Sequence, residues 1–151
     1  ENVRPEDILI LTYRNKYCER MSEKLKKGIP EIKKIINAYK KEEKDTYIFE
    51  KNAITISTIH GAKGYEAPVV FFIALDDFLE DCSRGAEEEK KFQYESECRA
   101  LFYVGATRAK YQLYLSGVDD HPNLLLKEIE KTHKMLQDKD IYKQEDLSPE
   151  P

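Results

Sequence analysis

The residues best suited to chemistry lie between two apolar runs, in the segment His60-Gly61-Ala62-Lys63-Gly64-Tyr65-Glu66. It holds an imidazole, an ammonium and a carboxylate, which can donate to or accept from a polar ligand. A second polar cluster, Thr107-Arg108-Ala109-Lys110, precedes another apolar run, and Tyr13-Arg14-Asn15 follows a third. Each of the three clusters is a candidate ligand-binding segment, and each also has a plain structural explanation.

The structural explanations are specific. A turn accounts for Gly61 and Gly64, since glycine is the default residue where φ must be positive. Arg108 alone is most simply a helix-end cation, stabilised by the helix dipole. The segment is not a phosphate-binding P-loop, which needs four residues between its glycines and then Lys-Ser or Lys-Thr. A KH-type GXXG clamp on nucleic-acid backbone joins two helices, whereas here strands are predicted on both sides.

Composition excludes several further classes of protein. The chain has 151 residues, 36% of them charged, and a net charge of −4, so any nucleic-acid site must be local. No apolar run approaches the roughly 18–20 residues that span a bilayer. Three cysteines without CxxC spacing predict reduced thiols in a cytoplasmic protein. The histidines and the acidic residues of 76–81 lack metal-ligand spacing, so no metal site is expected.

The elements that must position these clusters alternate between strand and helix patterns, which predicts an α/β domain with a mostly parallel sheet. Strands are predicted at 7–12, 53–59, 68–75 and 111–117, with a short one at 46–50. Helices are predicted from about 17 to 28, after Pro30 on the stripe Ile32, Ile35, Ile36 and Tyr39, from about Ser96 to Ala109, and after Asn123. Residues 76–91 are expected to form an acidic loop, and the tail 139–151 to be mobile. Because ligands bind beyond the carboxyl ends of parallel strands, we expect the polar clusters at one end of the sheet.

The combination of clusters is more specific than any one of them. The stretches "TISTIHGAKGYEAPVVFF" and "ECRALFYVGATRAKYQLYLSG" resemble motifs V and VI of superfamily 1 DNA helicases of the UvrD/Rep/PcrA type. The upstream stretch "DILILTYRNK" resembles the minor motif IVa of that family. The matching positions are Thr58, His60, Lys63, Gly64 and Glu66 in motif V, and Arg99, Tyr103, Val104, Thr107, Arg108 and Ala109 in motif VI.

The resemblance implies a fold and a partner. Residues 1–138 would form the second RecA-like domain of the helicase motor, a three-layer domain with helices on both faces of the sheet. In such motors ATP and Mg²⁺ lie in the cleft between two RecA-like domains, and the N-terminal domain carries the Walker A and B residues. Since the chain has no P-loop, we expect a fragment of a longer helicase, inactive alone and with no nucleotide bound.

The resemblance also implies roles for individual residues. Arg108 would be the arginine finger that neutralises charge on the γ-phosphate. Glu66 would accept a hydrogen bond from the nucleotide ribose, and Gly64 would allow close backbone approach nearby. Thr58 and His60 would contact the phosphates of single-stranded or duplex DNA, and that path would continue over Arg14 and Asn15. Lys63 receives no firm role.

The chain departs from the family pattern in two respects. The arginine-bearing motif IV would lie before Glu1. Only residues 26–52 occupy the place of a large accessory subdomain, and their continuous helical pattern favours a compact family member. Three other functions stay open: a helicase-like binding or regulatory module without a catalytic partner, an RNA-directed helicase, and the helicase part of a helicase–nuclease.

Overall fold

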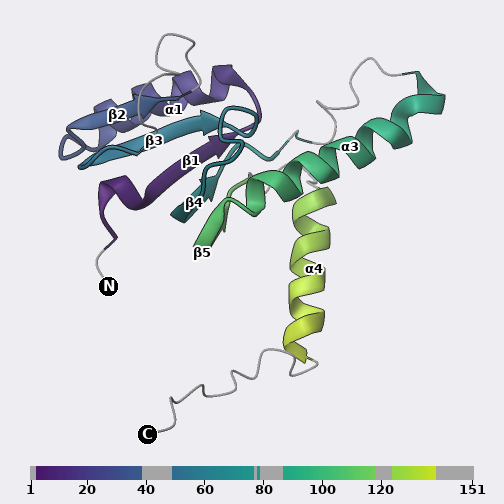
Figure 1. The fold of residues 1–151 in the computed structure, drawn as a ribbon. Coiled ribbons are helices and arrows are strands. Elements are labelled where there is room, and N and C mark those ends of the chain that lie inside the picture. The colour runs from purple at the N-terminus through teal and green to yellow at the C-terminus, as the bar shows by residue number, and fades with distance from the viewer. Residues whose placement is uncertain (1–2, 39–48, 77, 79–86, 118–123, 139–151) are drawn as a thin grey trace, which may run out of the picture.

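The computed structural model describes residues 3–38, 49–76, 78, 87–117 and 124–138. Its centre is a five-stranded sheet in the order β2-β3-β1-β4-β5 (Figure 1). The strands are β1 (Ile8–Thr12), β2 (Lys34–Asn37), β3 (Ala53–Thr58), β4 (Ala67–Phe72) and β5 (Ala109–Leu115). Every neighbouring pair is parallel, which confirms the predicted α/β class.

Helices cover both faces of this sheet. Side chains alternate along β1: Ile10 packs in the cluster that includes Cys18 and Met21 of α1 (Asn15–Gly28). Leu9 and Leu11 point the opposite way, into a core shared with α3 (Glu88–Ala106) and α4 (Leu124–Asp138). The period-two alternation of a strand buried on both faces therefore produces the expected three layers.

The segment after Pro30 is not the helix that its spacing predicts. Lys34–Asn37 form β2, which pairs with β3 so that Ile35 lies opposite Ile54. Two adjacent β-branched residues suit a half-buried edge strand better than a helix. Four apolar positions are too few to distinguish the periodicity of a helix from that of a strand. The gap region 26–52 therefore contributes a strand to the sheet, and its supposed helical continuity no longer supports a compact family member.

The other predicted elements are present with shifted ends. The strands at 53–59, 68–75 and 111–117 correspond to β3, β4 and β5, and β5 begins two residues early, at Ala109. α3 begins at Glu88, so the end of the expected acidic loop is helical. Of the short strand predicted at 46–50, residues 49 and 50 are described and lie in no strand. Residues 46–48 and the tail 139–151 lie outside the described residues.

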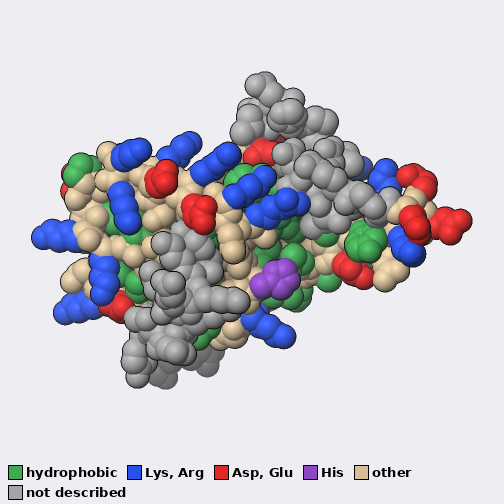
Figure 2. All heavy atoms as spheres, turned by 90° about the horizontal axis from the view of Figure 1, so that it is seen from above, with side chains coloured by type: hydrophobic (Ala, Val, Ile, Leu, Met, Phe, Trp, Pro, Cys, Tyr) green, Lys and Arg blue, Asp and Glu red, His purple; other side chains and the backbone are tan. Residues whose placement is uncertain are grey.

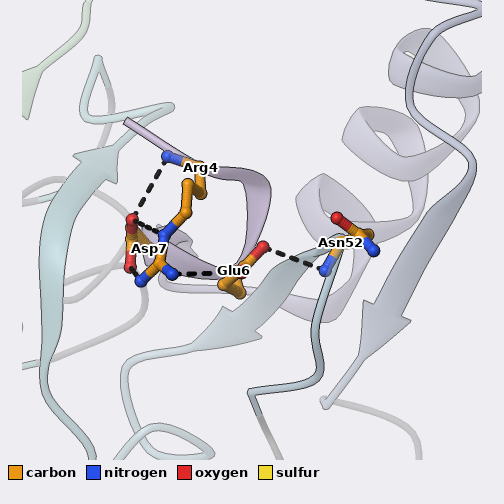
Figure 3. Close-up of polar contacts among 4 residues, drawn as sticks. All are labelled: Arg4, Glu6, Asp7 and Asn52. Carbon is orange, nitrogen blue, oxygen red and sulfur yellow. Dashed lines mark hydrogen bonds and ion pairs between the residues drawn. The ribbon is translucent and has the colours of Figure 1, made fainter. Parts of the chain in front are cut away.

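A polar cluster before β1 ties the start of that strand to the start of β3 (Figure 3). The 3₁₀-helix η1 (Pro5–Asp7) is closed by Arg4, whose Nε donates to Asp7 Oδ2 at 3.1 Å. Glu6 Oε2 accepts the backbone N–H of Asn52 at 2.9 Å, immediately before β3. The hydrogen bonds from Arg4 hold the pKa of the Asp7 carboxyl below its ordinary value. The start of the sheet is thus fastened by polar contacts at the surface.

The two described cysteines, Cys18 and Cys98, differ in whether they form a disulfide. Cys18 is a fully buried free thiol, as predicted. Cys98 is disulfide-bonded, so the prediction of three reduced thiols is wrong for this residue. Among the described helices, none combines the length and apolar character that a bilayer span requires.

Candidate nucleotide and nucleic-acid sites

Four predicted site residues meet where β1 and β3 end: Arg14, Asn15, Thr58 and His60. Thr12 and Thr58 are register partners on these adjacent strands, and the N–H of Ile59 extends the ladder to the carbonyl of Thr12 at 3.0 Å. The chain then leaves each strand at the same end of the sheet. The prediction that these residues gather beyond the carboxyl ends is therefore confirmed, and we call this group the carboxyl edge.

The turn after β3 presents the His60 side chain to solvent. Thr58 Oγ1 accepts the N–H of Gly61 at 3.2 Å, and the Thr58 carbonyl accepts the N–H of Ala62 at 2.9 Å. A Cβ atom on Gly61 would lie 2.6 Å from Ser57 Oγ, so this glycine lets the turn pack closely. Thr58 is thus part of the turn, and its hydroxyl can still donate its own hydrogen.

The carboxyl edge continues onto a basic helix. Arg14 has extended backbone at the N-cap of α1, and its guanidinium carbon lies 5.5 Å from the centre of the Tyr13 ring. The helix that follows carries more cations than anions, and Lys and Arg side chains spread over this part of the surface in Figure 2. Its basic residues are Lys16, Arg20, Lys24, Lys26 and Lys27, against Glu19 and Glu23. A locally positive surface therefore exists on a chain of net negative charge.

Glu66 and Arg108 meet at the opposite end of the sheet. They directly precede β4 and β5, whose first residues Ala67 and Ala109 are register partners. The N–H of Ala67 donates to the carbonyl of Arg108 at 2.9 Å, and this bond locks the two segments together. The expectation that Glu66 shares one end of the sheet with Thr58 is therefore wrong, and we call the second group the amino edge.

The loop of residues 59–66 explains the separation. β1 pairs with both β3 and β4, with Thr12 level with Thr58 and Ile8 level with Val69. The loop must therefore run back along the sheet before β4 begins. Strands of six residues, as β3 and β4 are, span about 20 Å at 3.3 Å per residue. Two sites that adjoin in sequence are thus held at opposite ends of a rigid sheet.

The Arg108 side chain is held against the end of α3. Its Nε donates to the carbonyl of Val104 at 2.8 Å, one terminal nitrogen donates to Thr107 Oγ1 at 3.2 Å, and the other to the carbonyl of Tyr65 at 3.5 Å. These contacts use three of the five N–H donors of a guanidinium. Thr107 in turn donates to the carbonyl of Val104 at 3.0 Å. Through its hydroxyl, Thr107 therefore helps to position Arg108. This role was not assigned to Thr107 in the sequence analysis.

The remaining residues of the amino edge are Gly64 and Lys110. Gly64 has φ of +87°, a left-handed conformation that only glycine adopts without strain. Lys110 Nζ lies 3.9 Å from Glu66 Oε2, so the carboxylate has a cationic neighbour. Both side chains are about half exposed, and such an ion pair contributes little to stability. Lys110 belonged to a predicted polar cluster, but only the pairing of β4 with β5 shows that it adjoins Glu66.

Among the residues that the structure describes, metal ligands gather at neither edge. Within the described ranges, no three His, Cys, Asp or Glu side chains lie close enough together to hold an ion. Glu66 is the carboxylate that adjoins Arg108, and Lys110 stands beside it. Glu66, Arg108 and Lys110 together offer two cations and one acceptor, a set that suits phosphate and hydroxyl groups better than a divalent cation. Glu6 and Asp7 lie at the same end of the sheet, before β1, with their carboxylates bonded to Asn52 and Arg4.

These observations define a three-layer α/β domain of the RecA-like class, with polar loops at both ends of its parallel sheet. The sequence model described as "UvrD-like helicase C-terminal domain" matches residues 6–120. Because this match covers most of the 151 residues, the chain belongs to the UvrD-like helicase C-terminal domain family.

Individual relatives agree with the family assignment. The chain is 46% identical over 67 residues to the ATP-dependent DNA helicase PcrA of Bacillus subtilis, covering 44% of this chain and 9% of that protein. It is 45% identical over 68 residues to the ATP-dependent DNA helicase srs2 of Schizosaccharomyces pombe, covering 45% of this chain and 7% of that protein. The matches thus involve less than a tenth of each relative's length.

A solved structure shares the fold. The C-terminal domain of a possible DNA helicase from Lactobacillus plantarum WCFS1 superposes with a TM-score of 0.51 at 20% identity, covering 74% of this chain and 56% of that one. The likeness supports the RecA-like arrangement of strands and helices. It carries no information on the roles of single residues at this identity.

Proposed function

We propose that this chain is the C-terminal motor domain of an ATP-dependent DNA helicase or translocase. Its amino edge would complete an ATP site with an N-terminal RecA-like domain, and its carboxyl edge would form part of the path of single-stranded DNA. The observation that carries the proposal is the meeting of Arg108 and Glu66 where β4 and β5 begin. Family membership and the DNA helicase names of the relatives support it.

Arg108 would act as the arginine finger. Phosphoryl transfer depends mainly on positioning and charge neutralisation, and an arginine from across a cleft contributes about 10³–10⁵-fold in rate. The bonds to Val104 and Thr107 fix the base of the guanidinium while leaving N–H donors for a phosphate. A finger held on one domain contacts the nucleotide only when the two domains close, so hydrolysis and opening of the cleft would be coupled.

The other amino-edge residues fit a nucleotide as well. The Glu66 carboxylate can accept from a ribose hydroxyl, and the backbone at Gly64 has no Cβ to block an approaching ligand. Lys110 adds a second cation within 3.9 Å of Glu66. The chain would thus hold part of ATP, while Mg²⁺ would be held by the phosphates and the partner domain.

The carboxyl edge would bind the strand through its phosphates. Thr58, His60 and Asn15 offer hydroxyl, imidazole and amide donors, and Arg14 offers a guanidinium. Such contacts fix the position of a strand without reading its sequence. The excess of Lys and Arg on α1 would extend the electrostatic attraction beyond these four residues.

Substitution of Arg108 in the full-length protein tests the nucleotide half of the proposal. We expect Arg108→Ala to lower DNA-stimulated ATP hydrolysis by about 10³-fold or more while single-strand affinity stays the same. Arg108→Lys keeps the charge but loses the planar fork of donors, so it should recover little of the rate. Unchanged turnover in Arg108→Ala would rule out the arginine-finger role.

A further inference from the structure

Arg99 matches a position of motif VI, but it belongs to neither edge of the sheet. It lies near the middle of α3, and its guanidinium bonds to Glu128 of α4. One terminal nitrogen donates to Oε2, and the other donates to Oε1 at 3.1 Å. These bonds hold the pKa of the Glu128 carboxyl below its ordinary value, so both partners are charged at neutral pH. We call this two-bond contact the Arg99–Glu128 fork.

The fork joins two helices that otherwise meet through apolar side chains. Leu125 of α4 is 5% exposed and lies in the same core cluster as Phe102 of α3. The rest of α4 runs away from the sheet (Figure 1). A groove of about 480 Å³ follows the junction, and Arg99 and Glu128 are among its lining residues. The two helices are therefore linked by a polar contact beside an open groove.

The position of the fork at the surface limits its contribution to stability. The Arg99 and Glu128 side chains are 42% and 53% exposed, and exposed ion pairs contribute little to the free energy of unfolding. A bidentate pair nevertheless fixes geometry, because both bonds require the guanidinium and the carboxylate to lie in one plane. Apolar contacts such as that of Phe102 are not directional, so they hold α3 against the sheet without fixing its rotation about its own axis. The fork can fix that rotation.

The rotation of α3 matters because Arg108 moves with this helix. Arg108 Nε donates to the carbonyl of Val104, in the last turn of α3, at 2.8 Å. Side-chain groups on a helix lie about 5–6 Å from its axis, so a rotation of roughly 10° moves them by about 1 Å. A misplacement of about 1 Å at a reacting group can lower a rate by about 10²-fold.

We propose that Arg99 and Glu128 are positioning residues for the arginine finger. Their fork fixes the rotation of α3 and with it the point at which Arg108 meets the γ-phosphate. The proposal rests on the proposed function, because it takes Arg108 as the finger. It gives α4, which supplies none of the residues that define the two edges, a part in the nucleotide site.

Kinetic constants of the full-length protein distinguish positioning from binding. Glu128→Gln keeps the size of the side chain but can accept only one of the two bonds. It should lower kcat for DNA-stimulated ATP hydrolysis by about ten- to a hundredfold and leave KM for ATP unchanged. Arg99→Gln should do the same, and the double variant should lose no more than either single variant, because both remove one interaction. Arg99→Lys keeps the charge without the planar fork and should recover little of kcat.

Glu130→Gln is the matched control. It removes a carboxylate of the same helix whose bond from Lys134 Nζ, at 2.9 Å, stays within α4, so kcat should not change. In urea unfolding of the 151-residue chain, Glu128→Gln and Glu130→Gln should have the same midpoint. The positioning role is refuted if Glu128→Gln leaves kcat unchanged, or if its kcat falls together with a lower urea midpoint than that of the control. Arg108→Ala separates this failure from that of the proposed function: if it too leaves kcat unchanged, the finger is refuted and the positioning role with it.

Discussion

Glycine 64 shows how a single residue shapes the amino edge. Its φ of +87° lets the loop turn toward β4, and no atom lies within 4 Å of where a Cβ would stand. The constraint is therefore conformational and not one of space. Gly28, at the end of α1, also has open space around it but lacks the positive φ. The two glycines thus differ in φ, which decides whether a residue with a Cβ can replace them without strain.

Alanine substitutions at these two glycines should have opposite effects. We expect Gly64→Ala to lower the free energy of unfolding by about 1–2 kcal/mol, the cost of a left-handed conformation for a residue with a Cβ. Gly28→Ala, the matched control, should be neutral or stabilising by up to about 1 kcal/mol, since alanine favours helix. Urea titrations of the 151-residue chain measure both, and equal effects would contradict the conformational explanation.

Cys18 is a second residue whose environment has a measurable consequence. Its sulfur lies 3.1 Å from Thr12 Oγ1, and the side chain is fully buried beneath α1. Burial raises the pKa of this thiol from 9.0 to about 11. Because the raised pKa favours the protonated form in the folded state, the thiol contributes stability below pH 9 that is lost as the pH rises to 11.

The free energy of unfolding should therefore fall between pH 9 and 11. A shift of two pKa units corresponds to about 2–3 kcal/mol at full effect. Urea unfolding at pH 8 and pH 11 would measure the fall in the unsubstituted chain and in Cys18→Ala. The Cys18→Ala variant keeps the same tyrosines and lysines. The difference between the two falls in the free energy of unfolding therefore gives the contribution of the thiol. Identical falls would show that Cys18 does not carry the effect.

At the scale of elements, α3 is positioned by close contact between Gly105 and Phe72. A Cβ on Gly105 would lie 2.7 Å from Phe72 Cε1 and 3.2 Å from Cζ. Phe72 is fully buried in β4 and stacks on Phe102 of α3 with ring centres 5.3 Å apart. The helix therefore rests directly on the ring, and it carries Arg108 just beyond its last residue, Ala106.

Gly105→Ala should destabilise the chain although alanine favours helix. Overpacking against a buried ring costs about 1–3 kcal/mol, more than the roughly 1 kcal/mol that alanine gains in a helix. The double variant Gly105→Ala with Phe72→Leu makes room for the new methyl group. In a double-mutant cycle its loss should be smaller than the sum of the two single losses. Additive losses would mean that the alanine methyl group at position 105 does not clash with the Phe72 ring.

How well each element could be predicted depended on the length of its pattern. β3, with Ile54, Thr55 and Ile56 in a clear run, and α1, ending at Gly28, follow from sequence. β2 did not, because Ile32, Ile35 and Ile36 fit a helical period by chance over a short span. Only the pairing with β3 distinguishes the two structures, and that contact is not local in sequence.

The candidate site likewise has features that the sequence predicts and features that only the fold reveals. Motif spacing identified Thr58, His60, Glu66 and Arg108, and the structure gathers them in two pairs as the strand ends require. The separation of the two pairs follows from parallel pairing alone, because Thr58 ends β3 whereas Glu66 and Arg108 precede β4 and β5; sequence reasoning missed it by treating residues 60–66 as one cluster. The pairing of β4 with β5 brings Lys110 beside Glu66, a neighbour that no local pattern reveals.

At the scale of the whole molecule, the proposed function assigns different ligands to the two ends of the sheet. The sheet between them is about 20 Å long by the rise of its strands. At 0.15 M salt the Debye length is about 8 Å, so charges at one edge are largely screened from ligands at the other. Under the proposed function, any influence of a nucleotide on DNA would therefore be transmitted by movement of rigid parts and not by the electric field of Arg108.

This separation predicts that substitutions at the two edges have unequal effects on DNA affinity. In the 151-residue chain at 0.15 M salt, Arg14→Ala and His60→Ala should weaken binding of single-stranded DNA, and Arg14→Ala should also reduce the salt slope by about 0.7, the value for one lost phosphate contact on a single strand. Lys110→Ala removes one positive charge, as Arg14→Ala does, but at the amino edge, and it should leave both affinity and slope unchanged. Fluorescence anisotropy over a salt series measures both quantities. An equal loss in Lys110→Ala would mean that the strand passes over the amino edge, and the assignment of the two edges would have to be reversed.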